Sequence, residues 1–315
     1  MLNFLLRRLV GLVPIWFAVA FFAFLIMYLI PGDPLVSILG PTASPDARAR
    51  MLAQLGLDQS FWVRFWSWLT GFLRGDLGES LFLGRPVLQA LAERAGVTIS
   101  LGLGALFFAV AIGIPLGLIA SLKPNSRFDI AVMIVSLIGL STPEFLFGLM
   151  LIYTFGVWLQ WLPIGGFVPF GDSVSGAIIH LLMPSFTLGF IHAAVIARMT
   201  RANLIEILGQ DYVRTARSKG LRERVVVVKH ALRLALIPTI TIIGFVTILI
   251  VAGAFITEIV FSIPGMGNLI VSAVQRRDYP LVQGAMLLIA TGVLLFNLVI
   301  DVLYTFLDPR IRYES

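Results

Sequence analysis

The chain has 315 residues, of which 58% are hydrophobic and only 13% are charged, and its mean hydropathy is +0.96. Soluble domains are about 45–50% apolar and about 25% charged, so one soluble core cannot bury this much apolar surface. The apolar runs are long and continuous, whereas a transmembrane barrel shows short alternating segments. Composition therefore excludes a soluble domain and a barrel, and it favours an all-α integral membrane protein.

The net charge of +6 has a simple explanation in a membrane protein. In a soluble protein, such a basic balance would suggest nucleic-acid binding. In a membrane protein it reflects the enrichment of Lys and Arg in cytoplasmic loops, so we expect no nucleic acid as a partner. The chain has no cysteine, which excludes disulfides, thiolate metal sites and cysteine nucleophiles.

Six windows are long enough to cross a bilayer, for which a helix needs about 20 apolar residues. They are Leu9–Ile30, Val97–Leu122, Phe128–Trp158, Ala177–Ala197, Ile237–Phe261 and Leu281–Leu307. The third window is overlong and contains Ser141-Thr142-Pro143-Glu144. Because proline removes a backbone donor and disfavours helix in the preceding residue, we expect a kink or break there.

The predicted spans divide the chain into four parts. Residues 1–30 hold a cytoplasmic N-terminus and an uncleaved first span, because the apolar run is longer than that of a cleavable signal. Residues 31–96 form an extracytoplasmic loop, and residues 97–307 form a five-helix core that includes a cytoplasmic loop at 198–237. Residues 308–315 form a cytoplasmic tail, so both termini lie inside, as the distribution of Lys and Arg also predicts.

The extracytoplasmic loop contains three tryptophans, Trp62, Trp66 and Trp68. They belong to the segment Gln59–Gly71, which has the pattern of an amphipathic helix at the membrane interface, where tryptophan is favoured. For this segment, a lid packed on the ends of the membrane helices is at least as good an interpretation as contact with a ligand.

The cytoplasmic loop has the pattern of a short helix held between two longer ones. Asp211 offers an N-cap for a helix over Tyr212–Lys219, and Gly220 provides a left-handed stop. A second helix, Arg222–Leu236, then leads into the fifth span. Val213 and Ala216 lie on one face of the short helix, and Arg214 and Arg217 on another. The pattern favours a helix that docks on another protein over a basic loop that binds lipid headgroups.

The motifs of an enzyme are missing. The chain contains no Gly-Lys dipeptide and therefore no P-loop, and it contains no HExxH motif. His180 and His192 are too far apart on one predicted helix to share a metal, and we interpret them as packed or hydrogen-bonded core residues. We therefore expect neither catalysis nor a directly bound metal or nucleotide.

Acidic residues near the predicted spans are candidates for a translocation path, because an ionisable group inside a membrane is functional by default. Glu144 lies beside the predicted break, and Glu258 lies near the end of the fifth span. Thr257 is a third candidate, because Leu249–Thr257 is the part of the fifth span that we expect to line the pore. The alternative for Glu144 is a structural hydrogen bond within the bundle. A secondary carrier would need paired charges and inverted repeats, and the sequence shows neither.

The cytoplasmic loop also resembles a known family. Gln210–Gly220, Lys229–Arg233 and Leu236–Pro238 are similar to the loop of ABC importer permeases that import dipeptides, oligopeptides, glutathione or nickel. Further matching motifs are Pro31–Pro34, Gly75–Gly78 with Ser80, Ser141–Phe145, Met183-Pro184, Glu258 with Phe261–Gly267, Asp278–Pro280 and Leu307–Arg310. One departure is that Arg214 and Thr215 replace the Glu-Ala that opens the general permease motif.

The resemblance implies six transmembrane helices with the fold of a type I ABC importer permease, in a bacterial or archaeal cytoplasmic membrane. It implies four kinds of partner: a second, homologous permease, two ATPase subunits that bind ATP and magnesium, a solute-binding protein and the bilayer. It makes the short helix the coupling helix that docks on an ATPase, with the residues Asp211, Tyr212, Val213, Arg214, Thr215, Ala216, Arg217, Ser218, Lys219, Gly220 and Leu221. Because no cluster of His, Met or carboxylates suggests nickel, we favour peptides as cargo over glutathione, nickel or another small solute.

Overall fold

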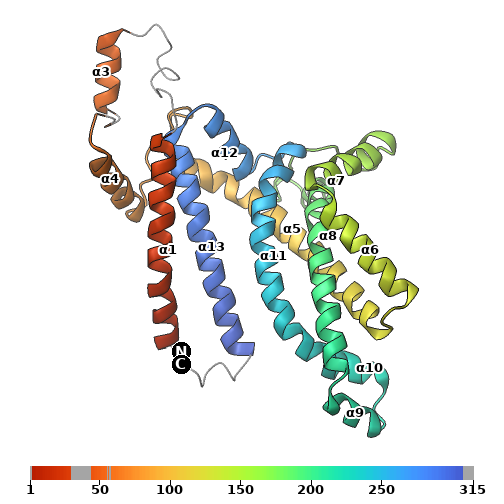
Figure 1. Cartoon of the computed structure of the whole chain (residues 1–315). Helices are drawn as coiled ribbons and strands as arrows, with labels where there is room; N and C mark the ends of the chain where they lie inside the picture. Colours follow the sequence, from red (N-terminus) through yellow and green to blue (C-terminus); the bar gives the residue numbers. More distant parts are fainter. Residues whose placement is uncertain (1, 30–43, 55, 57, 308–315) are drawn as a thin grey trace. The chain divides into compact units, whose positions relative to one another are not determined.

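The computed structural model describes residues 2–29, 44–54, 56 and 58–307 (Figure 1). The predicted motifs at Pro31–Pro34 and Asp308–Arg310, and the predicted tail at 308–315, lie outside these residues. The described chain is helical and contains no named strand, only an isolated bridge between Glu79 and Pro86. It folds as two compact units, which we call the terminal unit (residues 1–95 and 268–302) and the central unit (residues 96–267).

The terminal unit contains α1 (Leu2–Leu29), α3 (Pro45–Gln54), α4 (Phe61–Leu73), most of α12 (Met266–Gln275) and most of α13 (Tyr279–Leu307). Its core consists of the buried residues Ala20, Phe24, Phe65, Leu69 and Leu287. The indole nitrogen of Trp16 donates to the Thr291 hydroxyl at 2.8 Å, which joins α1 to α13.

The helix predicted at Gln59–Gly71 is confirmed as α4, and it packs along α1. The rings of Phe24 and Phe65 lie 5.5 Å apart, and those of Phe21 and Trp62 are stacked at 6.2 Å. Trp62 and Trp66 are nevertheless more than half exposed. One face of α4 is therefore fixed to α1. A role as a lid and a place at the membrane interface both stay predictions.

Two motifs that are far apart in the sequence meet in the terminal unit. The buried carboxylate of Asp278 accepts a hydrogen bond from the Ser80 hydroxyl and bonds of 3.2 Å from the backbone N–H groups of Leu81 and Phe82. The guanidinium of Arg276 lies 3.5 Å from the centre of the Phe82 ring. The turn after Ser80 is thus anchored on the residue that opens α13.

The central unit contains most of α5 (Val87–Leu122), then α6 (Arg127–Ser141), α7 (Glu144–Leu151), the π-helix η1 (Ile152–Trp158) and α8 (Val174–Leu208). It continues with α9 (Asp211–Ser218), α10 (Glu223–Val225), the π-helix η2 (Val226–Ala231) and α11 (Leu232–Val260). Its core includes Leu101, Leu188, Ile196, Ile250 and Phe261. α8 contacts α6, α7 and α11 and so forms the middle of the unit.

Glycine allows α5 to approach α8 closely. A Cβ at Gly117 would lie 2.5 Å from the Ala197 carbonyl oxygen and 2.8 Å from the Thr200 Cβ. Small residues are common where membrane helices pack. Lipid is as apolar as the side chains, so the helices associate through close van der Waals contact between backbones and not through a hydrophobic effect.

Five described helices are long and apolar enough to cross a membrane, and a sixth span is formed if the bent pair α6 and α7–η1 counts as one. The break predicted at Ser141–Glu144 is confirmed: Thr142 and Pro143 leave the helix, and the two parts are bent by 104°. α5 begins ten residues before the predicted span at Val97, and α12, apolar but only 10 residues long, was not predicted.

Candidate functional site

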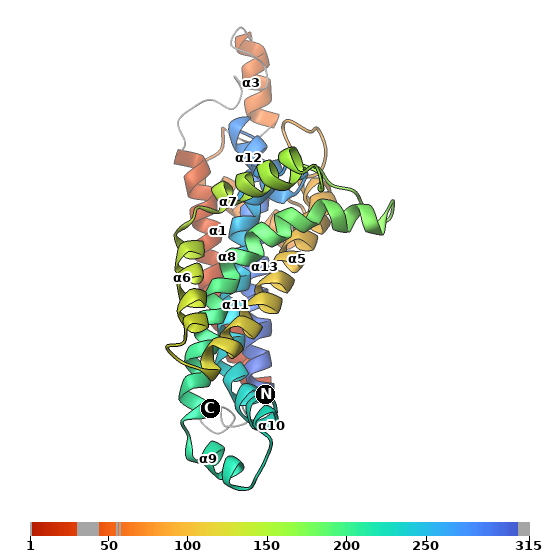
Figure 2. The ribbon, with the colours of Figure 1, turned by 90° about the vertical axis from the view of Figure 1, so that its right-hand side faces the viewer.

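The short helix predicted in the cytoplasmic loop is present as α9, between two long helical arms. We call α8 the first arm and the path α10–η2–α11 the second arm. α8 ends at Leu208, and α10, η2 and α11 follow α9 as one helical path from Glu223 to Val260. Figures 1 and 2 show α9 beyond the neighbouring ends of α8 and α10. The short helix is therefore carried on both arms at once.

The start of α9 differs from the expectation by one residue. Gln210, in extended conformation (φ −75°, ψ 152°), is the N-cap, and its side chain makes no capping bond. Asp211 is instead the first helical residue, where its carboxylate lies 3.6 Å from the Arg214 guanidinium. The predicted cap at Asp211 is therefore wrong, although a carboxylate in the first turn still suits the helix dipole.

The end of α9 is the predicted left-handed stop. Gly220 has a φ of +76°, its N–H donates to the Arg217 carbonyl at 2.9 Å, and the N–H of Leu221 reaches the Ala216 carbonyl at 3.4 Å. These two bonds form a Schellman motif, in which glycine is preferred because its missing Cβ permits a positive φ.

α9 has one packed face and one free face. Val213 is fully buried and Ala216 is half-buried, and the helix packs against η2. Arg214, Thr215, Arg217, Ser218 and Lys219 are all exposed. Partial burial raises the pKa of the Tyr212 hydroxyl above its ordinary value. The free face is thus a small, basic surface between two arms.

An exposed ion pair links α9 to the second arm. Arg217 donates from Nε and Nη2 to the two carboxylate oxygens of Glu223, at 3.1 and 2.7 Å. This bond raises the pKa of Arg217. The pair spans the Schellman turn and holds the end of α9 near the start of α10.

Above α9, the two arms pack directly on each other. Leu204 of α8 is fully buried against Ala231 and Ala235, with Ile207 and Leu208 beside them. The Asn203 amide also donates to the Thr239 hydroxyl at 3.4 Å. The two arms are therefore fixed to each other close to α9.

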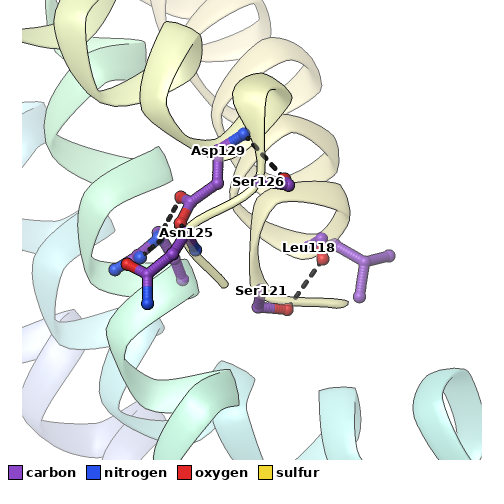
Figure 3. Close-up of polar contacts among 6 residues, drawn as sticks. Leu118, Ser121, Asn125, Ser126 and Asp129 are labelled. Carbon is purple, nitrogen blue, oxygen red and sulfur yellow. Dashed lines mark hydrogen bonds and ion pairs between the residues drawn. The ribbon is translucent and has the colours of Figure 1, made fainter. Parts of the chain in front are cut away.

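Another ion pair joins the first arm to α6, and the sequence analysis missed it. Arg201 of α8 donates from Nε and Nη2 to the two oxygens of Asp129, the second bond measuring 2.6 Å. Asp129 is only 2% exposed. Figure 3 shows its carboxylate at the turn formed by Asn125 and Ser126. The two residues are 72 positions apart, so no local pattern relates them.

Two of the three predicted path residues touch each other. The Thr257 hydroxyl donates to the carboxylate of Glu144, which is half-buried at the first turn of α7. The same carboxylate lies against Gly253, where a Cβ would come within 2.6 Å of its Oε2. Glu144 therefore ties the broken helix to α11 through a hydrogen bond, and its place on a translocation path stays a prediction.

The third of these residues, Glu258, is fully buried and holds the loop that follows α11. Its carboxylate accepts bonds from the Thr98 hydroxyl at 2.5 Å and from the N–H of Gly267 at 2.7 Å. The Thr98 hydroxyl in turn accepts from the N–H of Met266 at 2.9 Å. These contacts fix the Phe261–Gly267 motif to α5.

The described residues offer no group of three or more His, Cys, Asp or Glu side chains that could hold a metal ion. His180 Nδ1 lies 2.8 Å from the Gly176 carbonyl oxygen, and His192 is buried. Both histidines are therefore packed or hydrogen-bonded within α8, as predicted.

Comparison with known proteins covers nearly the whole chain. Residues 113–313 match the family described as binding-protein-dependent transport system inner membrane component, and residues 1–102 match the corresponding N-terminal family. A protein of Brucella abortus (strain 2308) named as a peptide transport system permease is 41% identical over 310 residues, with 98% of this chain and 99% of the relative covered. The dipeptide transport system permease protein DppB of Escherichia coli (strain K12) is 39% identical over 339 residues, with both chains fully covered.

A solved structure has the same fold. A chain from inward facing conformations of the MetNI methionine ABC transporter superposes with a TM-score of 0.53 at 20% identity, and it covers 70% of this chain and 97% of its own length. The all-α fold of a type I ABC importer permease, expected from the resemblance, is thus confirmed. This chain belongs to the inner membrane components of binding-protein-dependent transport systems, and it is a multi-pass transmembrane permease.

Proposed function

We propose that the chain forms half of the translocation pore of an ATP-driven importer and that α9 is its coupling helix. The observation that carries this proposal is a helix of 8 residues, closed by Gly220, with a free basic face and both ends fixed to long membrane helices. Two turns of helix are not stable alone in water, so such a structure needs a rigid support. Two packed arms provide it and also give any movement of α9 a direct route into the bundle.

The partners follow from this role. A second, homologous permease completes the pore as a heterodimer, and two ATPase subunits bind ATP and magnesium beneath it. A solute-binding protein delivers cargo from outside. The distribution of Lys and Arg supports an orientation with α9 and both termini in the cytoplasm, where the proposed ATPases would act.

Peptides are the cargo that we propose. The support comes from two relatives, a peptide transport permease at 41% identity and a dipeptide transport permease at 39% identity. Glutathione, nickel or another small solute is the alternative, and the ligand of the cognate binding protein would distinguish them.

Glu144 and Thr257 are the residues that we propose for the translocation path. Their contact lies at the 104° break between α6 and α7, and broken helices in transporters often border the substrate route. Glu258 stays a weaker candidate, because its carboxylate is fully enclosed and bonded to Thr98 and Gly267.

The test is a gentle affinity purification of the tagged chain from its native membrane, followed by mass spectrometry and reconstitution. We expect a second permease, ATPase subunits and a solute-binding protein, and the ligand carried by the last protein identifies the cargo. A chain that purifies alone or as a homo-oligomer and still transports after reconstitution would contradict the proposal, and it would favour a secondary carrier.

A further inference from the structure

The broken helix α6–α7 is fastened to both arms of the α9 loop. At its start, Asp129 binds Arg201 of α8 through two hydrogen bonds. At the break, Glu144 accepts the hydroxyl of Thr257 in α11. All four residues belong to the central unit, and α8 and α11 are the two helices that carry α9. A change in the relative position of the arms must therefore act on α6–α7 at two fixed points.

The attachment at Asp129 is fully satisfied and directional. Besides Arg201, its carboxylate accepts the backbone N–H of Asn125 at 2.8 Å, while its own N–H donates to the Ser126 hydroxyl at 3.2 Å (Figure 3). Asn125 has a φ of +62°, so the turn before α6 is tight. The same carboxylate thus holds the α5–α6 turn and α8 together.

The attachment is also close to α9 along a continuous helix. Arg201 precedes the end of α8, Leu208, by seven residues, which corresponds to about 10 Å of helix. No proline lies between these two residues. The proline of α8 is Pro184, and that of α11 is Pro238. A movement of α9 therefore reaches Arg201 through about two turns of regular helix.

Stability alone does not explain a charged pair at this place. Buried ion pairs often contribute less to stability than apolar side chains of similar size, because both charges lose their hydration. A bidentate guanidinium–carboxylate pair instead fixes one geometry. Apolar side chains would hold α6 on α8 by packing alone, whereas this pair adds two directional bonds between defined atoms.

We propose that Asp129 and Arg201 are positioning residues that transmit the movement of α9 to the α6–α7 break. Closure of the ATPases would then change the position of Glu144 relative to α11. The inference rests on the proposed role of α9 as a coupling helix, and it adds the route by which coupling enters the pore. Coupling free energies are reciprocal between sites. The same pair therefore also couples binding of the solute-binding protein to the ATP-bound state of the ATPases, and the rate of ATP hydrolysis is the readout of that coupling.

The test uses the reconstituted complex of permeases, ATPases and binding protein. The measured quantity is the stimulation ratio, which is the ATP hydrolysis rate with the co-purified binding protein divided by the rate without it. In Asp129→Asn we expect this ratio to fall at least about fivefold, while the basal rate and the amount of bound ATPase stay near parental. The matched control is Glu93→Gln, which removes the carboxylate of the exposed pair with Arg85 and should leave the ratio unchanged.

A second variant keeps the proposal testable if Asp129→Asn does not fold. The chain has no cysteine, so Asp129→Cys with Arg201→Cys introduces two unique thiols and leaves no buried charge unpaired. We expect a low stimulation ratio in the reduced variant and recovery when a short bifunctional thiol reagent joins the two positions. A merely structural pair would change folded yield and both rates together, with no dependence on the cross-link.

The outcomes separate this inference from the proposed function. If the parental complex is stimulated by the binding protein but Asp129→Asn is stimulated equally, the inference is wrong and the coupling role of α9 stands. A cross-linked double-cysteine variant that stays unstimulated also overturns the inference. If the parental chain binds no ATPase at all, the proposed function itself fails.

Discussion

Two bidentate arginine–carboxylate pairs lie on either side of the α8–α9 junction, and they differ in their surroundings. Arg201 and Asp129 have side chains that are 22% and 2% exposed, whereas Arg217 and Glu223 are 42% and 59% exposed. The first pair joins two membrane helices, and the second joins α9 to α10. The same type of ion pair thus occurs once between packed helices and once at an exposed turn.

The difference indicates a division between a fixed part and an adjustable part. A buried charge cannot separate from its partner without a large desolvation cost, so the Asp129–Arg201 pair keeps α6 and α8 in one register. An exposed pair exchanges readily with water and salt, so Arg217 and Glu223 would let α9 adapt to the partner surface that we propose for it. Four substitutions test this contrast, beginning with the largest expected effect.

Arg201→Ala should destabilise the central unit most. It leaves the carboxylate of Asp129 without its cation. Breaking a fully buried pair in this way costs about 3–5 kcal/mol, and the 22% exposure of Arg201 places this pair toward the lower end of that range. We expect a marked loss of folded protein and a lower Tm in detergent. A Tm equal to that of the parental chain would show that Asp129 is not held as the structure has it.

Gly220→Val should destabilise α9 locally and release the ATPase. A β-branched residue at a φ of +76° costs about 1–3 kcal/mol, which is enough to open the Schellman turn. Hydrogen exchange of the α9 amides should accelerate, and less ATPase should co-purify. Gly220→Asn is the matched control, because asparagine tolerates the left-handed region, and it should retain most of the ATPase. Equal retention in both variants would contradict the importance of the turn.

Val213→Ala should loosen α9 on η2. Val213 is fully buried, and removing two methyl groups costs about 1.5 kcal/mol. We expect faster hydrogen exchange in α9 and unchanged exchange in the membrane helices. Thr215→Ala is the control, because Thr215 is exposed and its hydroxyl bonds only to the Asp211 carbonyl of the same helix. Similar exchange in the two variants would argue against a packed face.

Glu223→Gln should have the smallest effect. An exposed ion pair contributes less than about 1 kcal/mol, and salt weakens it further. We expect a Tm within error of the parental value and slightly faster hydrogen exchange of the α9 amides. At high salt this difference from the parental chain should disappear. A loss of Tm as large as that of Arg201→Ala would remove the contrast between the two pairs.

Much of the fold could be predicted from the sequence because its signals are local. Hydropathy located all six windows, Pro143 located the break, and Gly220 located the end of α9. The segment with Trp62, Trp66 and Trp68 was correctly predicted to be helical. Each prediction depends on residues within one or two turns of each other, where the rules of spacing and backbone geometry apply directly.

Other features could not be predicted because they depend on tertiary contacts. α12 is too short to be predicted as a span from hydropathy. The first ten residues of α5, starting at Val87, are too polar to be included in the predicted second span. Asp211 looks like a cap, but Gln210 occupies the cap position in the folded chain. The Asp129–Arg201 and Ser80–Asp278 contacts join residues 72 and 198 positions apart, and one sequence contains no signal that pairs them.

The central claim is that the free face of α9 docks on an ATPase, and site-directed cross-linking tests it most directly. Arg214 is 73% exposed, and the chain has no cysteine, so Arg214→Cys carries a unique thiol on that face. Activating this thiol with a short heterobifunctional reagent in the native complex should join the chain to an ATPase subunit, whereas Glu93→Cys should not. An intact complex in which position 214 never cross-links to an ATPase would contradict the claim.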